Sequence, residues 1–135
     1  MPVVKTVELP LTRQEDVVAV RQRTRSLGVE IGLTIVDQTK IVTAASELAR
    51  NTVIHGGGGK ATIEIVKEAS KQGLRLTFED CGPGIPDLER AMQDGYTSGA
   101  GLGLGLGGSK RLCNDFAIES KVGKGTRVTI ARWKA

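Results

Sequence analysis

Residues 101–108 read Gly-Leu-Gly-Leu-Gly-Leu-Gly-Gly, and this stretch constrains the fold more than any other part of the sequence. The chain has 18 glycines, and they cluster here and at 56–59 instead of repeating with a collagen-like period. A flexible linker is one interpretation, but leucine at every second position is not a linker composition. The clusters therefore indicate loops with a function.

Strands and helices alternate around these loops. Pro10 is expected to end the first strand, Thr12 to cap the first helix, and Gly28 to stop that helix. A turn is expected at 71–73, between two strands that form a hairpin. The expected strands are 3–9, 61–67, 74–79, 116–122 and 126–133, and the expected helices are 12–27, 37 or 39 to 55, 87–94 and 106–114.

This order of elements predicts an α/β (α+β) fold. Amphipathic helices interleaved with strands form a two-layer sandwich, in which helices cover one face of a mixed sheet. The other face is then free to meet solvent or a partner. At 135 residues the chain is expected to form a single domain over 1–135, with no linker or disordered tail.

Composition excludes several functions. The net charge of +4 is spread among acids without a basic block, and aromatic residues are only 3%, so nucleic acid is not expected as a partner. Cys81 and Cys113 have no metal or redox spacing and are expected to be buried or semi-buried thiols of a reducing compartment. Without a signal pattern or a stretch of ~20 apolar residues, we expect a cytoplasmic protein that does not contact membranes.

The second helix carries the first candidate site. Glu47 and Asn51 are four residues apart and share a face, which His55 extends by one turn. A carboxylate and an amide oxygen held together could position a hydroxyl or help to hold Mg²⁺, which prefers oxygen ligands. Taken alone, the pair is more typical of a solvated helix face.

A second candidate site follows the hairpin, at Asp80-Cys81-Gly82-Pro83-Gly84. An aspartate at a strand terminus can accept a hydrogen bond from an exocyclic amine such as adenine N6. Gly82 and Gly84 would let the backbone approach a flat ligand closely. A simple turn is the alternative, because Asp, Gly and Pro are the usual turn residues.

The glycines of 101–108 suit an anion. Successive glycines let backbone N–H groups converge on phosphate oxygens, and the helix that follows adds favourable dipole charge. The segment is neither a Walker A loop, which ends in Gly-Lys-Ser/Thr, nor a Rossmann turn, which needs a preceding strand. Because no Lys or Arg occurs between Gln93 and Gly108, Lys110 or Arg111 would have to meet a terminal phosphate, or else be surface charge.

Together these segments resemble the GHKL ATPases, which have the Bergerat fold. Glu47-x-x-x-Asn51 matches the family's N box, Asp80-x-Gly82-x-Gly84 its first glycine box, and residues 101–108 its second. Gly123-x-Gly125-Thr126 matches the final box, where the threonine hydroxyl is expected to help hold the adenine-binding acid. The matches span nearly the whole chain.

Within this family the sequence is most similar to small stand-alone serine/threonine protein kinases, the switch kinases of the stress-response complex called the stressosome, which are related to anti-sigma-factor kinases. The resemblance implies ATP and Mg²⁺ as cofactors. It also implies STAS-domain scaffold or antagonist proteins as substrates, and a PPM-type phosphatase regulator or similar output protein as the partner of the released kinase. Whether the protein forms a homodimer stays open.

The resemblance assigns roles to ten residues. Glu47 would be the general base, and Asn51 would hold Mg²⁺. The nucleotide-binding set would be Asn51, Asp80, Gly82, Gly84, Gly101, Gly103, Gly105, Lys110 and Thr126. Two other functions are compatible with the same motifs: an ATP-dependent anti-sigma factor that acts chiefly by sequestration, and a detached histidine-kinase catalytic domain.

Overall fold

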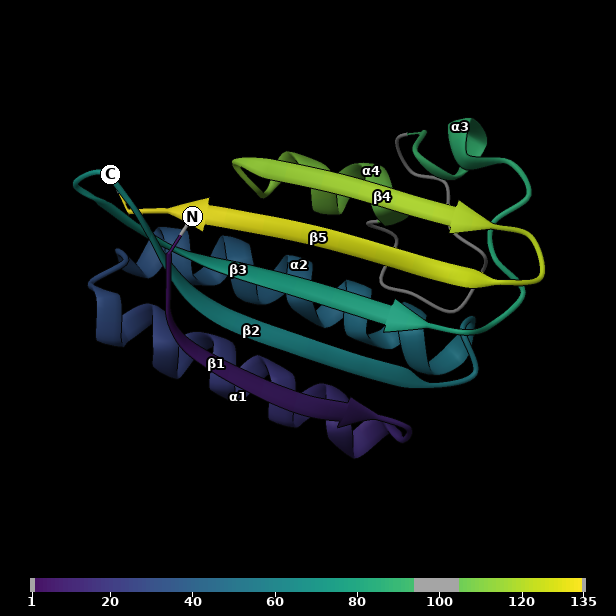
Figure 1. Ribbon diagram of the computed structural model, residues 1–135, viewed down its shortest axis with the longest axis horizontal. Helices are drawn as coiled ribbons and strands as arrows, with labels where there is room; N and C mark the ends of the chain where they lie inside the picture. Colours follow the sequence, from purple (N-terminus) through teal and green to yellow (C-terminus); the bar gives the residue numbers. More distant parts are fainter. Residues whose placement is uncertain (1, 94–104, 135) are drawn as a thin grey trace.

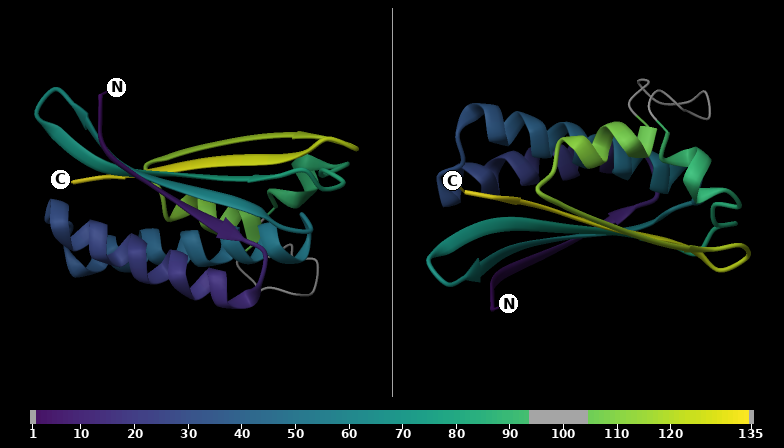
Figure 2. Two further views of the ribbon diagram at one scale, coloured as in Figure 1. Left: turned by 60° about the horizontal axis from the view of Figure 1, so that its bottom comes forward. Right: turned by 90° about the horizontal axis from the view of Figure 1, so that it is seen from above.

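The protein is a sandwich of one sheet and one layer of helices in a computed structural model, which describes residues 2–93 and 105–134 (Figure 1). Five strands lie in the order β1-β2-β3-β5-β4, and the helices cover one face of the sheet (Figure 2). The strands are β1 (Val3–Leu11), β2 (Gly59–Glu68), β3 (Lys71–Asp80), β4 (Asp115–Lys121) and β5 (Gly125–Trp133). The helices are α1 (Gln14–Ile31), α2 (Ile35–Ile54), α3 (Leu88–Ala91) and α4 (Gly105–Arg111). The two-layer architecture predicted from the sequence is confirmed.

The prediction of a mixed sheet is wrong, because every strand pair among the described residues is antiparallel. One crossover helix between neighbouring strands would make them parallel. Here two antiparallel helices, α1 and α2, separate β1 from β2, so the chain re-enters the sheet in the opposite direction. On the other side, β5 lies between β3 and β4 and pairs with both.

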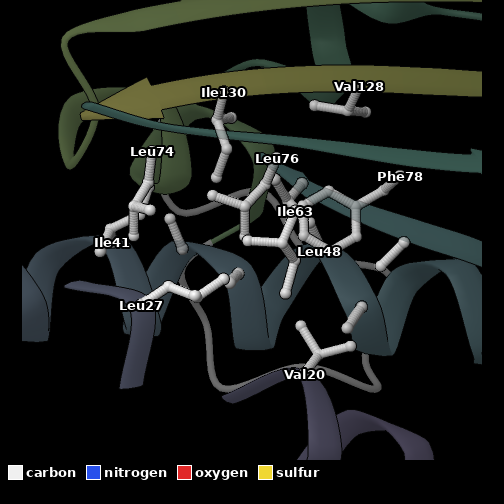
Figure 3. Close-up of a cluster of buried hydrophobic side chains, with 14 of the residues drawn as sticks. Val20, Leu27, Ile41, Leu48, Ile63, Leu74, Leu76, Phe78, Val128 and Ile130 are labelled. Atoms are coloured by element: carbon white, nitrogen blue, oxygen red, sulfur yellow. The ribbon is translucent and has the colours of Figure 1, made fainter. Parts of the chain in front are cut away.

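The core lies between the sheet and the α1–α2 layer. Leu27, Ile41 and Leu48 of the two helices are at most 2% exposed and pack against inward-facing side chains of the central strands, Leu76 and Phe78 among them (Figure 3). Burying a side chain of this size contributes about 1.5–3 kcal/mol. Within the part of the chain that the structure describes, no helix is both long and apolar enough to cross a membrane.

Two expected stop signals do not stop their elements. β1 continues through Pro10 to Leu11, because β1 is an edge strand, where a missing N–H need not break the ladder. α1 continues through Gly28 and ends at Gly32, which has the left-handed φ of 83° that favours glycine. Gly28 is buried in the helix, and a Cβ there would make ordinary van der Waals contact, 3.4 Å from side-chain atoms of both Leu33 and Gln38.

The hairpin turn was also misplaced by the sequence analysis. Glu68 pairs with Lys71, so the turn consists of Ala69 and Ser70, and 71–73 belong to β3. Gly73 lies under the indole of Trp133, since a Cβ there would come within 2.7 Å of that ring. Glycine is therefore required at position 73 by its contact with Trp133, a residue far along the chain. Turn propensities do not reveal such a contact.

The start of α1 is stabilised by Asp16, not capped by Thr12 as expected. The residue before the helix is Arg13, and the backbone N–H groups of Thr12 and Arg13 donate to Asp16 Oδ2 at 2.8 and 3.0 Å. These hydrogen bonds lower the pKa of Asp16 from its ordinary value of 3.8, and the bond from Thr12 has the largest effect. The stabilisation is therefore complete above that value and is lost as the pH falls through the lower pKa of the folded state.

Asp16→Asn is expected to lower the melting temperature by a few degrees at neutral pH, because the amide accepts these N–H groups more weakly than a carboxylate. The difference between variant and unsubstituted protein should shrink once Asp16 is protonated in both states. Thermal unfolding followed by circular dichroism from pH 7 into the acid range measures this. A difference that is independent of pH would contradict the assignment.

Candidate functional site

A cavity of about 340 Å³ opens between the helices and one end of the sheet. Its walls come from the second half of α2, the end of β3, the segment 84–91, the start of α4 and the start of β5. The C-terminal end of β3, α3 and the start of β5 lie together at the right in Figure 1. The volume is within the ~300–1,000 Å³ typical of small-molecule sites.

The interior of the cavity is mostly apolar. Leu48, Phe78 and Val128 line it, and the close-up of the core shows these three side chains between α2 and the sheet (Figure 3). Ile85 and Leu106 complete the apolar lining. Apolar walls with a few polar groups at the margins suit a ligand that has a flat aromatic part.

α2 supplies one polar margin. Thr34 caps the helix through its hydroxyl, and Glu47, Asn51 and His55 then reach the cavity from successive turns. The Glu47 side chain is only 3% exposed, and its Oε1 has no hydrogen-bond partner within the described residues. Arg50 Nη1 lies 3.9 Å from that oxygen, which is an ion-pair distance beyond hydrogen-bond reach. A buried carboxylate oxygen in this state can accept a hydrogen bond from a ligand or water, or bind a cation.

Asp80 supplies the other polar margin, at the end of β3. Its Oδ1 accepts hydrogen bonds from the backbone N–H groups of Gly82 and Thr126, at 2.9 and 3.2 Å. No hydrogen bond to Oδ2 occurs among the residues that the structure describes. The carboxylate is thus oriented by protein backbone through one oxygen, and the second oxygen can accept from a ligand.

The glycines around Asp80 pack protein against protein. A Cβ on Gly82 would clash with the backbone of Gly56, and one on Gly84 would clash with the backbone of Lys121. Gly84, with φ of 78°, also lines the cavity, whereas Gly82 does not. The close approach expected at these glycines is therefore made by the protein's own backbone, which fixes the loop that carries Asp80.

Thr126 lies on the wall opposite α2, and its contacts differ from the expectation. Its backbone N–H, not its hydroxyl, donates to Asp80. The hydroxyl is 2.8 Å from Ser120 Oγ, and Ser120 also accepts from the backbone N–H of Ile85 at 2.8 Å. Ser120 therefore joins the β4–β5 hairpin to the loop after β3. The sequence analysis missed it, because a lone serine on an expected strand carries no local signal.

The glycine-rich segment is only partly described. Gly101 and Gly103 lie outside the described residues, while Gly105 begins α4 and lines the cavity. Lys110 is exposed in the last turn of α4 and does not line the cavity. Arg90 of α3 does line the cavity. The sequence did not indicate Arg90 as a phosphate-binding cation, because it lies before the glycine-rich segment and not next to it.

The oxygen donors suit a hard cation. Glu47 and Asn51 offer a carboxylate and an amide oxygen on the wall of the cavity, and Glu47 Oε1 is buried without a hydrogen bond from any described residue. Residues 2–93 and 105–134 contain no group of three or more His, Cys, Asp or Glu side chains arranged for a metal. Mg²⁺ needs no such cage, because it usually binds one or two protein oxygens, substrate phosphates and waters.

The two cysteines are free thiols in different surroundings. Cys81 is exposed beside Asp80, contrary to the expectation of a buried or semi-buried thiol. Cys113 is half-buried, and burial raises its pKa to about 12. Cys113 is thus a neutral, structural thiol at physiological pH.

The fold and cavity define a class of nucleotide-binding protein. The chain belongs to the histidine kinase-, DNA gyrase B- and HSP90-like ATPase family, whose model matches residues 36–135. It is 46% identical over 118 residues to the serine/threonine-protein kinase RsbT of Bacillus subtilis, covering 87% of this chain and 89% of that protein. It is 36% identical over 104 residues to an anti-sigma F factor of Clostridium kluyveri, covering 73% of this chain and 72% of that protein.

Solved structures have the same fold. The RsbU and RsbW domains of a Mycobacterium tuberculosis protein match with a TM-score of 0.64 at 21% identity, covering 96% of this chain and 32% of that chain. The mycobacterial sensor histidine kinase MprB matches with a TM-score of 0.54 at 17% identity, covering 95% of both chains. The resemblance inferred from the sequence motifs is confirmed at the level of family and fold.

Proposed function

We propose that this chain is an ATP-dependent serine/threonine protein kinase that phosphorylates STAS-domain scaffold proteins. Once released from them, it activates a PPM-type phosphatase regulator or a similar output protein. The observation that carries the proposal is the buried Glu47 Oε1, which accepts no hydrogen bond from the described residues and lies on the wall of an apolar cavity that Asp80 also lines. The 46% identity to a protein named a serine/threonine-protein kinase supports the same function.

In this proposal the nucleotide lies lengthwise in the cavity. The free oxygen of Asp80 accepts a hydrogen bond from adenine N6, and Leu48, Phe78 and Val128 contact the ring. Gly56 lies beside the loop that carries Asp80, and Glu47 is nine residues earlier, which is roughly 13 Å along a helix. With adenine at Asp80, Glu47 would therefore lie toward the phosphates. The phosphates would lie along the glycines of 101–108, as the motif predicts, with Arg90 in place of Lys110 as the nearby cation.

Glu47 acts as the general base in this proposal. It accepts the proton of the substrate hydroxyl as that oxygen forms a bond to the γ-phosphorus, and the bond to the β–γ bridging oxygen breaks to release ADP. General-base assistance of this kind contributes about 10²–10⁴-fold to the rate. Mg²⁺, held through Asn51 and the phosphates, would neutralise charge on the phosphate oxygens.

The same proposal includes the cellular setting. Residues 1–135 act as one ATP-binding domain in the cytoplasm, where reducing conditions suit the free thiols of Cys81 and Cys113. Neither nucleic acid nor a membrane is a partner in this proposal.

A second candidate function is sequestration of a sigma factor, with phosphotransfer secondary. It is favoured by the 36% identity to an anti-sigma F factor. Both functions require the same nucleotide site, so the cavity cannot separate them. They differ in which protein forms a stable complex with this chain.

Incubation with labelled ATP, a STAS-domain protein and a sigma factor separates the candidates. We expect acid-stable phosphate on the STAS protein and no lasting sigma complex, measured by autoradiography and size-exclusion chromatography. Stable sigma binding without STAS phosphorylation would favour sequestration. Acid-labile phosphate on the acceptor would instead indicate transfer to histidine and would refute serine or threonine as the acceptor.

A further inference from the structure

An arginine far from the cavity connects three of the elements that line it. Arg132, near the end of β5, donates from Nη2 to Asp37 Oδ1 at 2.8 Å and from Nη1 to the backbone carbonyl of Leu112 at 3.3 Å. Asp37 lies in the first turn of α2, and Leu112 directly follows α4. The guanidinium thus bridges the start of α2 to the end of α4, and we call these three residues the Arg132 bridge.

The elements joined by the Arg132 bridge all reach the cavity at their other ends. α2 carries Glu47, which is ten residues or roughly 15 Å beyond Asp37. β5 carries Thr126, and α4 begins at Gly105. The Arg132 bridge therefore lies outside the nucleotide site but can set how its walls are aligned.

α4 needs such external support. It has only seven residues, and three of them are glycine, each costing about 1 kcal/mol relative to alanine in a helix. Isolated helices of this length are not stable in water. Ser109 Oγ donates to the Gly105 carbonyl at 3.0 Å within the helix, and Leu106 is buried in the core. At its C-terminal end, Arg132 donates to the Leu112 carbonyl, and the backbone N–H of Asn114 donates to the Ala131 carbonyl at 2.9 Å, so β5 holds the segment after α4 at both points.

The Arg132 bridge is poorly designed for stability alone. Both charged side chains are 16% exposed, and Arg132 Nε is buried without a hydrogen-bond partner within the described residues. Buried ion pairs with incomplete hydrogen bonding often stabilise a fold no more than apolar residues of similar volume. The planar guanidinium of an arginine donates in fixed directions, so it can place α4 precisely against α2. A pair of apolar side chains has no such directional contacts.

We propose that Arg132 and Asp37 are positioning residues for nucleotide binding, which hold α4, the helix that follows the glycine-rich segment of the sequence, in register with Glu47 and Asn51 on α2. The inference rests on the proposed function, because it assigns the phosphates to that segment. It also gives a role to Asp37, which no contact with the cavity explains.

The chain contains a matched control pair. Arg75 and Glu64 form an ion pair of the same 2.8 Å length, with side chains 26% and 17% exposed. They are cross-strand partners, and the flanking residues Ile63, Ile65, Leu74 and Leu76 are buried against the helices. The control pair therefore points to the opposite face of the sheet, away from the cavity, although the backbone of Arg75 also pairs with Ala131 of β5.

The test compares Arg132→Met, the double variant Asp37→Leu/Arg132→Met, and the controls Arg75→Met and Glu64→Leu/Arg75→Met. We expect both Arg132 variants to weaken binding of ATP with Mg²⁺ by about tenfold or more, because small misplacements of a binding element are costly. The controls should change affinity less than about twofold. Arg132→Lys, which keeps the charge but lacks the fork, should recover only part of the loss.

A second measurement needs no nucleotide. Backbone amides of 106–112 should exchange hydrogen faster in the Arg132 variants than in the controls, while amides of β2 and β3 stay equally protected. Unchanged exchange in α4, or equal loss of ATP affinity in the Arg132 and Arg75 variants at equal melting temperature, would overturn the proposal. If the unsubstituted protein bound no adenine nucleotide, the proposed function would fail, and the exchange rates alone would decide the role of the Arg132 bridge.

Discussion

Glu47→Gln is expected to reduce phosphotransfer by about 10²–10⁴-fold, the usual contribution of a general base, while ATP affinity stays within a few-fold. The amide keeps the size and polarity of the side chain but cannot accept the proton of a hydroxyl. Because Glu47 Oε1 is buried and accepts no hydrogen bond from the residues that the structure describes, removing its charge should also leave the melting temperature unchanged or raise it. Activity is therefore expected to fall without a loss of stability.

Three measurements check this prediction: phosphate transfer at saturating ATP, nucleotide affinity by calorimetry, and thermal unfolding. Glu64→Gln is the matched control, because Glu64 is a partly buried glutamate on the other face of the sheet. It should leave phosphotransfer intact. Loss of ATP affinity in Glu47→Gln would show that Glu47 binds nucleotide and is not the base.

Asp80→Asn is expected to weaken ATP binding by roughly 10²-fold, because a charged acceptor of the adenine amine is lost and hydrogen bonds to charged groups are worth about 1.5–3 kcal/mol. Part of any loss could be structural, since Asp80 Oδ1 also accepts from the N–H groups of Gly82 and Thr126. A second ligand separates the two causes.

Inosine triphosphate is that ligand, because it carries a carbonyl where adenine has its amine. The unsubstituted protein should bind ATP much more tightly than inosine triphosphate, since Asp80 cannot donate to that carbonyl. In Asp80→Asn the amide can donate, so the preference for ATP should fall by about tenfold or more. Equal weakening of both nucleotides would assign the effect to the loop, and unchanged affinity for both would remove Asp80 from the site.

Lys110 and Arg90 differ in how well the sequence predicts their distance from the cavity. Lys110 follows the glycine-rich segment directly, so spacing alone favoured it as the phosphate cation, yet it is exposed and away from the cavity. Arg90 precedes that segment by more than ten residues and still lines the cavity, because α3 packs over the nucleotide-sized space. Ser120 was missed for the same reason, since its partners Ile85 and Thr126 come from two segments far apart in the chain, the loop after β3 and the start of β5.

The sequence by itself determined the family, the order of helices and strands, and the residues Glu47, Asn51, Asp80 and Thr126 that line the cavity. These follow from local patterns, because helical spacing, strand ends and glycine clusters are properties of short segments. Only the tertiary structure decided that Gly73 packs under Trp133, that all paired strands are antiparallel and that Arg132 bridges α2 to α4. Each of these depends on a partner distant in the chain, and packing against that partner overrides local propensity.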